Sequence, residues 1–106
     1  MLRSPKSHAR ILAALGDEVR LQLVARLCAG PMSITRLTAG SKVTRQAITK
    51  HLRVLEQAGI VHSVRAGRHS LFRFDPAPLH ELEDYLRRVA EQWDEVLARL
   101  KSLVEG

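Results

Sequence analysis

Residues that could read a nucleic-acid sequence lie close together near the middle of the chain. If the segment 44–58 is a helix that turns by about 100° per residue, one face carries Arg45, Gln46 and Thr49. Arginine can donate two hydrogen bonds to guanine, glutamine can pair with adenine, and threonine can touch the thymine methyl group. The opposite face is apolar and consists of Ile48, Leu52 and Leu55. This pattern predicts an amphipathic helix whose polar face contacts base edges.

Basic residues surround this polar face and could bind phosphate groups. The expected phosphate contacts are Lys42, Lys50 and Arg53, followed by Arg65, Arg68 and Arg73. Thr44, at the start of the helix, belongs to the same expected DNA-binding surface. Residues 33–74 carry eight basic residues and one acidic residue, a net charge of +7, whereas residues 75–106 carry four basic and eight acidic residues, a net charge of −4. A basic centre joined to an acidic end predicts a polyanion-binding module with a second functional part.

The elements that would position these residues can be predicted from caps and periodicity. We expect a first helix over 7–15, a second that begins after Asp17, and a short third that begins after Ser33. A turn at 39–41 and an N-cap at Thr44 introduce the fourth helix. The β-rich runs 60–65 and 69–74 flank Ala66-Gly67-Arg68 and predict a hairpin. Two helices joined by a tight turn and followed by a basic hairpin are typical of a winged helix-turn-helix.

The C-terminal segment 79–104 has a regular apolar stripe. The spacing alternates between three and four residues through Leu79, Leu82, Leu86, Val89, Trp93, Val96, Leu100 and Leu103. Such a heptad pattern predicts a long helix that pairs with a second chain; the alternative is a helix packed within one subunit. The expected dimer interface combines this helix with the first one and comprises Leu12, Leu15, Leu82, Leu86, Val89, Trp93, Val96 and Leu100. The fold class is therefore mainly α with a small β-hairpin, in one domain over 1–106.

Several stretches resemble the ArsR/SmtB family of bacterial winged helix-turn-helix repressors. They are 15–21 (LGDEVRL), 43–52 (VTRQAITKHL), 55–61 (LEQAGIV), 66–68 (AGR) and 71–74 (LFRF). The resemblance spans about residues 8–100. It implies a homodimer, with the first and last helices at the interface, that binds an inverted-repeat operator as a repressor and could regulate its own gene. The amino-acid sequence of residues 44–52 is most similar to that of family members encoded beside START-type proteins. This similarity implies a regulator without a metal site.

The sequence departs from the metal-sensing members of that family. Ser33 and Thr35 stand where such members carry cysteine thiolates, and the last helix has a single histidine, His80, with no Asp-x-His pair. We therefore expect no metal site and no cofactor, whereas the sequence leaves open whether a small-molecule effector exists. His62 and His69 are interpreted as surface or phosphate-contacting residues rather than metal ligands.

Composition and motifs exclude several other classes of protein. The single cysteine, Cys28, excludes a disulfide framework and a zinc site built on several thiolates. No segment approaches the roughly 20 apolar residues of a membrane span, so a cytoplasmic protein is expected. Neither a phosphate-binding glycine loop nor a nucleophile–base motif is found, so no enzyme is expected. The alternatives are a helical protein–protein interaction module with a non-specific basic face and an RNA-binding winged helix.

Four individual residues have predicted environments. Cys28 shares a helical stripe with Leu21 and Val24 and is expected to be buried. His51 is expected to be an inner, hydrogen-bonded histidine, and Trp93 to lie in the interface core. For Arg20 the sequence leaves three roles open: a DNA contact, a pair with Asp17, or a pair with an acidic residue of the last helix.

Overall fold

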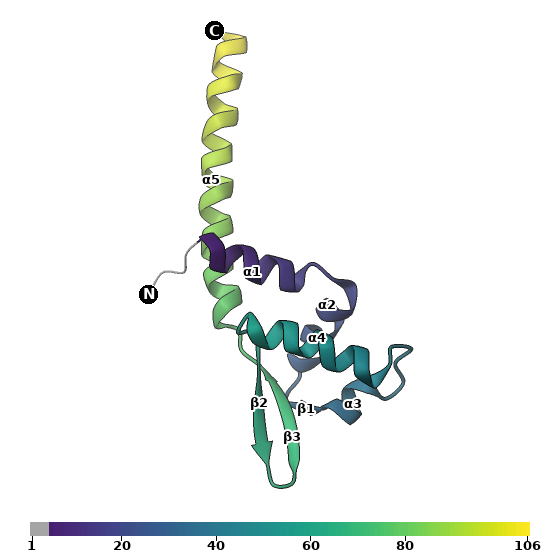
Figure 1. Cartoon of the computed structure of the whole chain (residues 1–106). Helices are drawn as coiled ribbons and strands as arrows, with labels where there is room; N and C mark the ends of the chain where they lie inside the picture. Colours follow the sequence, from purple (N-terminus) through teal and green to yellow (C-terminus); the bar gives the residue numbers. More distant parts are fainter. Residues whose placement is uncertain (1–4) are drawn as a thin grey trace.

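The computed structural model describes residues 5–106, and Figure 1 shows a helical body from which one long helix projects. Within these residues, the elements are α1 (Pro5–Leu15), α2 (Glu18–Leu27), β1 (Met32–Ser33), α3 (Ile34–Thr38), α4 (Arg45–Gln57), β2 (Val61–Ala66), β3 (His69–Phe74) and α5 (Ala77–Glu105). The expected winged helix-turn-helix fold is confirmed, including the hairpin and the long last helix. The predicted single domain spans 1–106, and its first four residues lie outside the described part.

Side-chain caps begin three of the helices, as the sequence predicts. The side chains of Asp17, Ser33 and Thr44 accept hydrogen bonds from the backbone N–H groups of Arg20, Arg36 and Ala47. Each cap satisfies an N–H group that has no partner within its own helix. These caps set where α2, α3 and α4 start, and therefore which residues occupy the first turn of α4.

The sheet has one more strand than the sequence predicts. Its strand order is β1-β3-β2, and both pairings are antiparallel. Met32 of β1 lies opposite Phe72, and Val61 of β2 lies opposite Phe74. Because β1 is only two residues long, it is too short to show the alternation of apolar and polar residues from which a strand is predicted. The hairpin turns at Gly67, whose φ of 62° is readily adopted by glycine.

The core lies between the base of the sheet, helices α1 to α4 and the start of α5. Its fully buried side chains include Ile11, Leu37, Ile48, Leu52, Leu55, Ile60 and Val61. The predicted apolar face of α4 is confirmed, since Ile48, Leu52 and Leu55 are all buried. Leu82 departs from the expected interface. It is 5% exposed in the single chain and belongs to the subunit's own core, so the exposed stripe of α5 begins at Leu86.

The predicted burial of Cys28 is wrong, because its side chain is exposed. The buried face of α2 consists of Leu23, Val24 and Leu27, while Leu21 is exposed. Cys28 is the C-cap residue of the helix and lies beyond this face. The stripe through Leu21, Val24 and Cys28 therefore does not mark the core.

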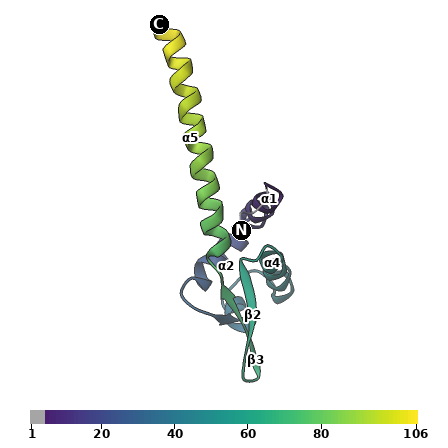
Figure 2. The ribbon, with the colours of Figure 1, turned by 90° about the vertical axis from the view of Figure 1, so that its left-hand side faces the viewer.

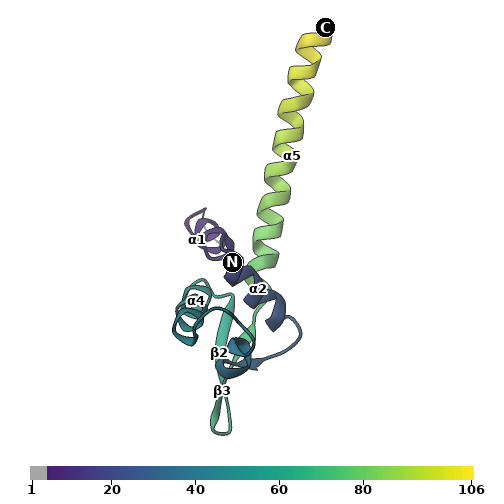
Figure 3. The same cartoon turned by 90° about the vertical axis from the view of Figure 1, so that its right-hand side faces the viewer.

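Helix α5 extends far beyond the body of the subunit. The views in Figures 1, 2 and 3 agree that it leads away on the side opposite the hairpin, and the molecule measures 68 × 33 × 23 Å. Its first turns pack on α1, where the rings of His8 and Tyr85 are stacked with centroids 4.4 Å apart. Among the described residues, none after Leu82 is buried, so most of α5 is left uncovered by the rest of the subunit. Within residues 5–106, no helix is long and apolar enough to cross a membrane.

Asp75 joins the base of the hairpin to the start of α5. Its carboxylate accepts a hydrogen bond from the backbone N–H of Ala77, at 3.0 Å, and lies 2.9 Å from Nε2 of His62. These contacts, chiefly the one from Ala77, lower the pKa of Asp75 below its ordinary value of 3.8. Because the folded pKa lies below the unfolded value, the carboxylate stabilises the fold above about pH 4, and this contribution is lost as the pH falls.

We therefore expect Asp75→Ala to lower the free energy of unfolding at pH 7, and we expect its difference from the wild type to shrink as the pH falls below the ordinary carboxyl pKa of 3.8. Urea unfolding at pH 7, 4 and 3, at one protein concentration, measures the difference. Asp84→Ala, which removes an exposed carboxylate of α5, serves as the control and should have little effect. A difference between Asp75→Ala and the wild type that does not change with pH would contradict this role of Asp75.

Candidate nucleic-acid interface

The polar face of α4 is open to solvent. Arg45, Gln46, Lys50 and Arg53 are exposed, and Thr49 is half-buried. Lys42, in the loop before the helix, is exposed as well. The predicted base-contacting and phosphate-contacting residues of this segment are therefore all at least partly accessible to solvent.

Local hydrogen bonds hold the start of α4 against α3. Nη1 of Arg45 lies 3.1 Å from Oγ1 of Thr35, which accepts its hydrogen bond. Oγ1 of Thr49 donates to the carbonyl of Arg45 at 2.8 Å. Thr44 is occupied as the N-cap, since its hydroxyl accepts from the N–H of Ala47 at 3.1 Å. The contact between Thr35 and Arg45 has no local signal in the sequence, because it depends on how α3 packs on α4.

The three arginines of the hairpin are exposed, but they do not share one face of the ribbon. Arg65 lies opposite Ser70, and Arg73 lies opposite His62. Because side chains alternate along a strand and paired residues share a face, Arg65 and Arg73 point to opposite faces. Arg68 lies in the turn beside Gly67. The tip of the wing is thus basic on more than one side, and Arg73 lies nearer its base, where its charge helps to lower the pKa of Asp75.

Of the three roles that the sequence left open for Arg20, the pair with Asp17 is found in part, because the charge of Arg20 helps to lower the pKa of Asp17, but the hydrogen bonds of the guanidinium go elsewhere. Its guanidinium donates to the backbone carbonyls of Ala14, at 2.6 Å, and Ala13, at 3.3 Å, and lies 3.1 Å from Nδ1 of His51. Asp17 instead accepts from the backbone N–H of Arg20, and this bond is the main cause of its lowered pKa. The prediction that His51 is an inner, hydrogen-bonded residue is confirmed.

The residues considered as metal ligands have other neighbours. Ser33 caps α3, Thr35 contacts Arg45, and His62 pairs with Asp75. Within residues 5–106, no three His, Cys, Asp or Glu side chains come together in a way that could hold a metal ion.

Comparison with known proteins places this architecture in a family. Residues 9–64 match the model of a family described as "Helix-turn-helix domain". The chain is 32% identical over 101 residues to the HTH-type transcriptional regulator Rv2034 of Mycobacterium tuberculosis, covering 95% of this chain and 92% of that protein. The solved structure of an ArsR-like transcriptional regulator from Rhodococcus sp. RHA1 superposes with a TM-score of 0.85 at 36% identity, covering 92% of each chain. This chain belongs to the ArsR/SmtB family. Like its relatives, this ArsR/SmtB member is a DNA-binding transcriptional regulator.

The fold is shared with a more distant winged helix-turn-helix domain. It is the homodimeric winged helix-turn-helix DNA-binding domain of Mb0332 from Mycobacterium bovis, with a TM-score of 0.65 at 22% identity, covering 85% of this chain and 83% of that one. Membership of the ArsR/SmtB family favours a DNA-binding regulator over the interaction module that composition left open.

Proposed function

We propose that this regulator is a homodimeric repressor that binds an inverted-repeat DNA operator and needs no metal or cofactor to do so. The observation that carries the proposal is the exposed polar face of α4, which presents Arg45 and Gln46 beside a basic wing. No reaction is assigned to the protein, since repression requires only that it occupy the operator. Its site of action would be the cytoplasm, where bacterial DNA lies.

In the proposed complex, α4 lies in the major groove. The major groove admits a helix and presents a distinct pattern of donors and acceptors for each base pair. Arg45, Gln46 and Thr49 would contact base edges, and Lys42, Lys50 and Arg53 would contact phosphates. Arg65 and Arg68, near the tip of the wing, would bind the neighbouring backbone, where cations displace condensed counterions.

The proposed dimer rests on the uncovered stripe of α5. Leu86, Val89, Trp93 and Leu100 are all more than 40% exposed in the single chain, and Trp93 reaches 59%. Contiguous apolar surface of this kind is typical of an interface. On α1, Leu12 is also exposed, whereas Leu15 is half-buried. A twofold axis through this interface would place two α4 helices about one turn of DNA apart.

In vitro selection from a pool of random duplexes tests the proposal and identifies the operator in the same experiment. Purified protein, kept in a chelator, is expected to enrich an inverted repeat whose half-sites lie about 10 base pairs apart. Enrichment of single half-sites would contradict the proposed dimer. Failure to enrich any sequence would contradict sequence-specific binding altogether.

Lys50 is expected to contribute affinity without sequence preference. Lys50→Ala should weaken binding to all duplexes by a similar factor and reduce the slope of log K against log salt by about one. Fluorescence anisotropy titrations at several salt concentrations measure this slope. Lys101→Ala, which removes the same charge from the far end of α5, should leave the slope unchanged. A Lys50→Ala variant that weakened binding to only one sequence would show that Lys50 contacts bases instead.

A further inference from the structure

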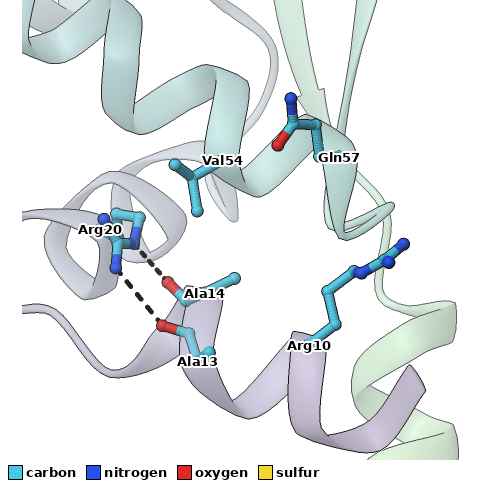
Figure 4. A pocket seen from close by; sticks show the side chains of 6 residues that line it. All are labelled: Arg10, Ala13, Ala14, Arg20, Val54 and Gln57. Atoms are coloured by element: carbon cyan, nitrogen blue, oxygen red, sulfur yellow. Dashed lines mark hydrogen bonds between the residues drawn. The ribbon is translucent and has the colours of Figure 1, made fainter. Parts of the chain in front are cut away.

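Arg20 connects three helices through a single guanidinium group. It lies in the first turn of α2 and donates to the carbonyls of Ala13 and Ala14, near the C-terminal end of α1 (Figure 4). Its third contact, 3.1 Å long, joins Nη1 to Nδ1 of His51 in the middle of α4. Because the last carbonyls of a helix have no intrahelical partner, Arg20 caps α1 while it also holds α4.

The chemistry of this contact fixes the state of His51. A guanidinium has donors only, so Nδ1 of His51 must be the acceptor and carries no proton. The carboxylate of Asp17 lies 3.9 Å from the same nitrogen and accepts from the backbone N–H of Arg20. Asp17 thus supports the arginine that reaches His51.

The two helices joined by Arg20 are not packed together along their whole length. An open groove of about 550 Å³ separates part of α1 from α4, and it is lined by Arg10, Ala13, Ala14, Arg20, Val54 and Gln57. Figure 4 shows the gap between the α1 side chains and the pair Val54 and Gln57. Since side chains do not fill this space, directional hydrogen bonds have more influence on the angle between α1 and α4 than they would in a closely packed contact.

We infer that the contact between Arg20 and His51 positions the DNA-reading helix α4 relative to the dimerisation helix α1, and thereby sets which spacing of half-sites the dimer accepts. The inference rests on the proposed function. In a twofold dimer, a change in the angle between α1 and α4 moves both α4 helices in opposite directions. Such a change alters their separation, while the side chains that contact DNA stay intact. Arg20 is thus a positioning residue rather than a DNA contact.

The test compares two duplexes: the inverted repeat recovered by selection, and the same repeat with one base pair inserted between its half-sites. Wild-type protein is expected to prefer the first. Arg20→Met keeps the aliphatic part of the side chain but removes the hydrogen-bond donors. It should reduce this preference about tenfold, which is a typical size for the coupling between two sites in a protein. Light scattering should still show a dimer.

The matched control is Arg26→Met, because Arg26 also lies on α2 but donates to the backbone carbonyls of Arg36 and Leu37, which belong to α3. Arg26→Met should retain the preference.

Variants of His51 test the same link from the other side. His51→Leu removes the acceptor and should lose the preference, as Arg20→Met does. His51→Asn places an oxygen where Nδ1 stands and should restore it. This pair keeps the test decisive if Arg20→Met fails to fold. Retained spacing preference in Arg20→Met or His51→Leu, or an equal loss in Arg26→Met, would overturn the inference. A wild-type protein that prefers no duplex would instead overturn the proposed function on which it rests.

Discussion

A double variant with Arg45→Ala and Gln46→Ala is expected to bind operator and scrambled duplexes almost equally. Both side chains are exposed at the start of α4, where each can form two hydrogen bonds with one base. A contact of this kind contributes about 1–3 kcal/mol of discrimination, so losing both should reduce the preference by roughly 100-fold or more. Competition titrations with the two duplexes measure this ratio.

The charge removed with Arg45 must be separated from its role in reading bases. Arg88→Ala removes an exposed arginine from α5 and should leave the preference for the operator unchanged. Circular dichroism should show an intact fold in both variants, because the N-cap of α4 is provided by the side chain of Thr44, which neither variant changes. If the double variant kept the full preference for the operator, α4 would not be the reading helix, or its reading face would be elsewhere.

Trp93→Glu is expected to separate the dimer into monomers of 11.9 kDa and to weaken operator binding by about 100-fold. Trp93 is the most exposed of the large apolar residues in the middle of the α5 stripe, and a carboxylate buried at that position would have no partner. Affinity falls because each monomer then binds one half-site without the help of the second. Light scattering and anisotropy titrations measure the two effects on the same sample.

Ala98→Glu is the matched control for this variant. It introduces the same charge five residues later in the helix, on the exposed face opposite the stripe through Leu86, Val89 and Trp93. It should remain dimeric and bind the operator normally. A Trp93→Glu protein that still runs as a dimer would contradict the proposed role of α5 at the interface.

Local signals explain why the reading helix could be predicted from the sequence. Thr44 is a good cap, and Ile48, Leu52 and Leu55 repeat at helical spacing, so the start, length and buried face of α4 all follow from neighbouring residues. The hairpin is equally local, since two β-rich runs flank a glycine that turns the chain.

Periodicity alone could not divide the stripe of α5 between two roles. Leu82 and Trp93 both lie on the heptad stripe, yet Leu82 lies in the subunit's core and Trp93 is open to solvent. The difference arises because α1 packs against the first turns of α5 only, a contact between the two ends of the chain. The prediction for Cys28 is wrong for a related reason, since two apolar stripes on α2 fit helical spacing and tertiary packing selects the other one.

The role of Arg20 could not be found from the sequence because its partners are backbone carbonyls and a distant side chain. Ala13 and Ala14 carry no side-chain signal, and His51 lies 31 residues away. The three roles considered for Arg20 all required a charged partner or DNA. A guanidinium that caps one helix and holds another is visible only when the helices are placed in space.

Sequence-specific binding by α4 is tested most directly by titrating the protein into the selected inverted repeat and into its scrambled counterpart, at two salt concentrations and in the presence of a chelator. We expect a preference of about 10³ or more for the inverted repeat, retained in the chelator, with both affinities falling as salt rises. Equal, steeply salt-dependent binding to the two duplexes would contradict this function, because the basic surface would then bind polyanions without reading their sequence.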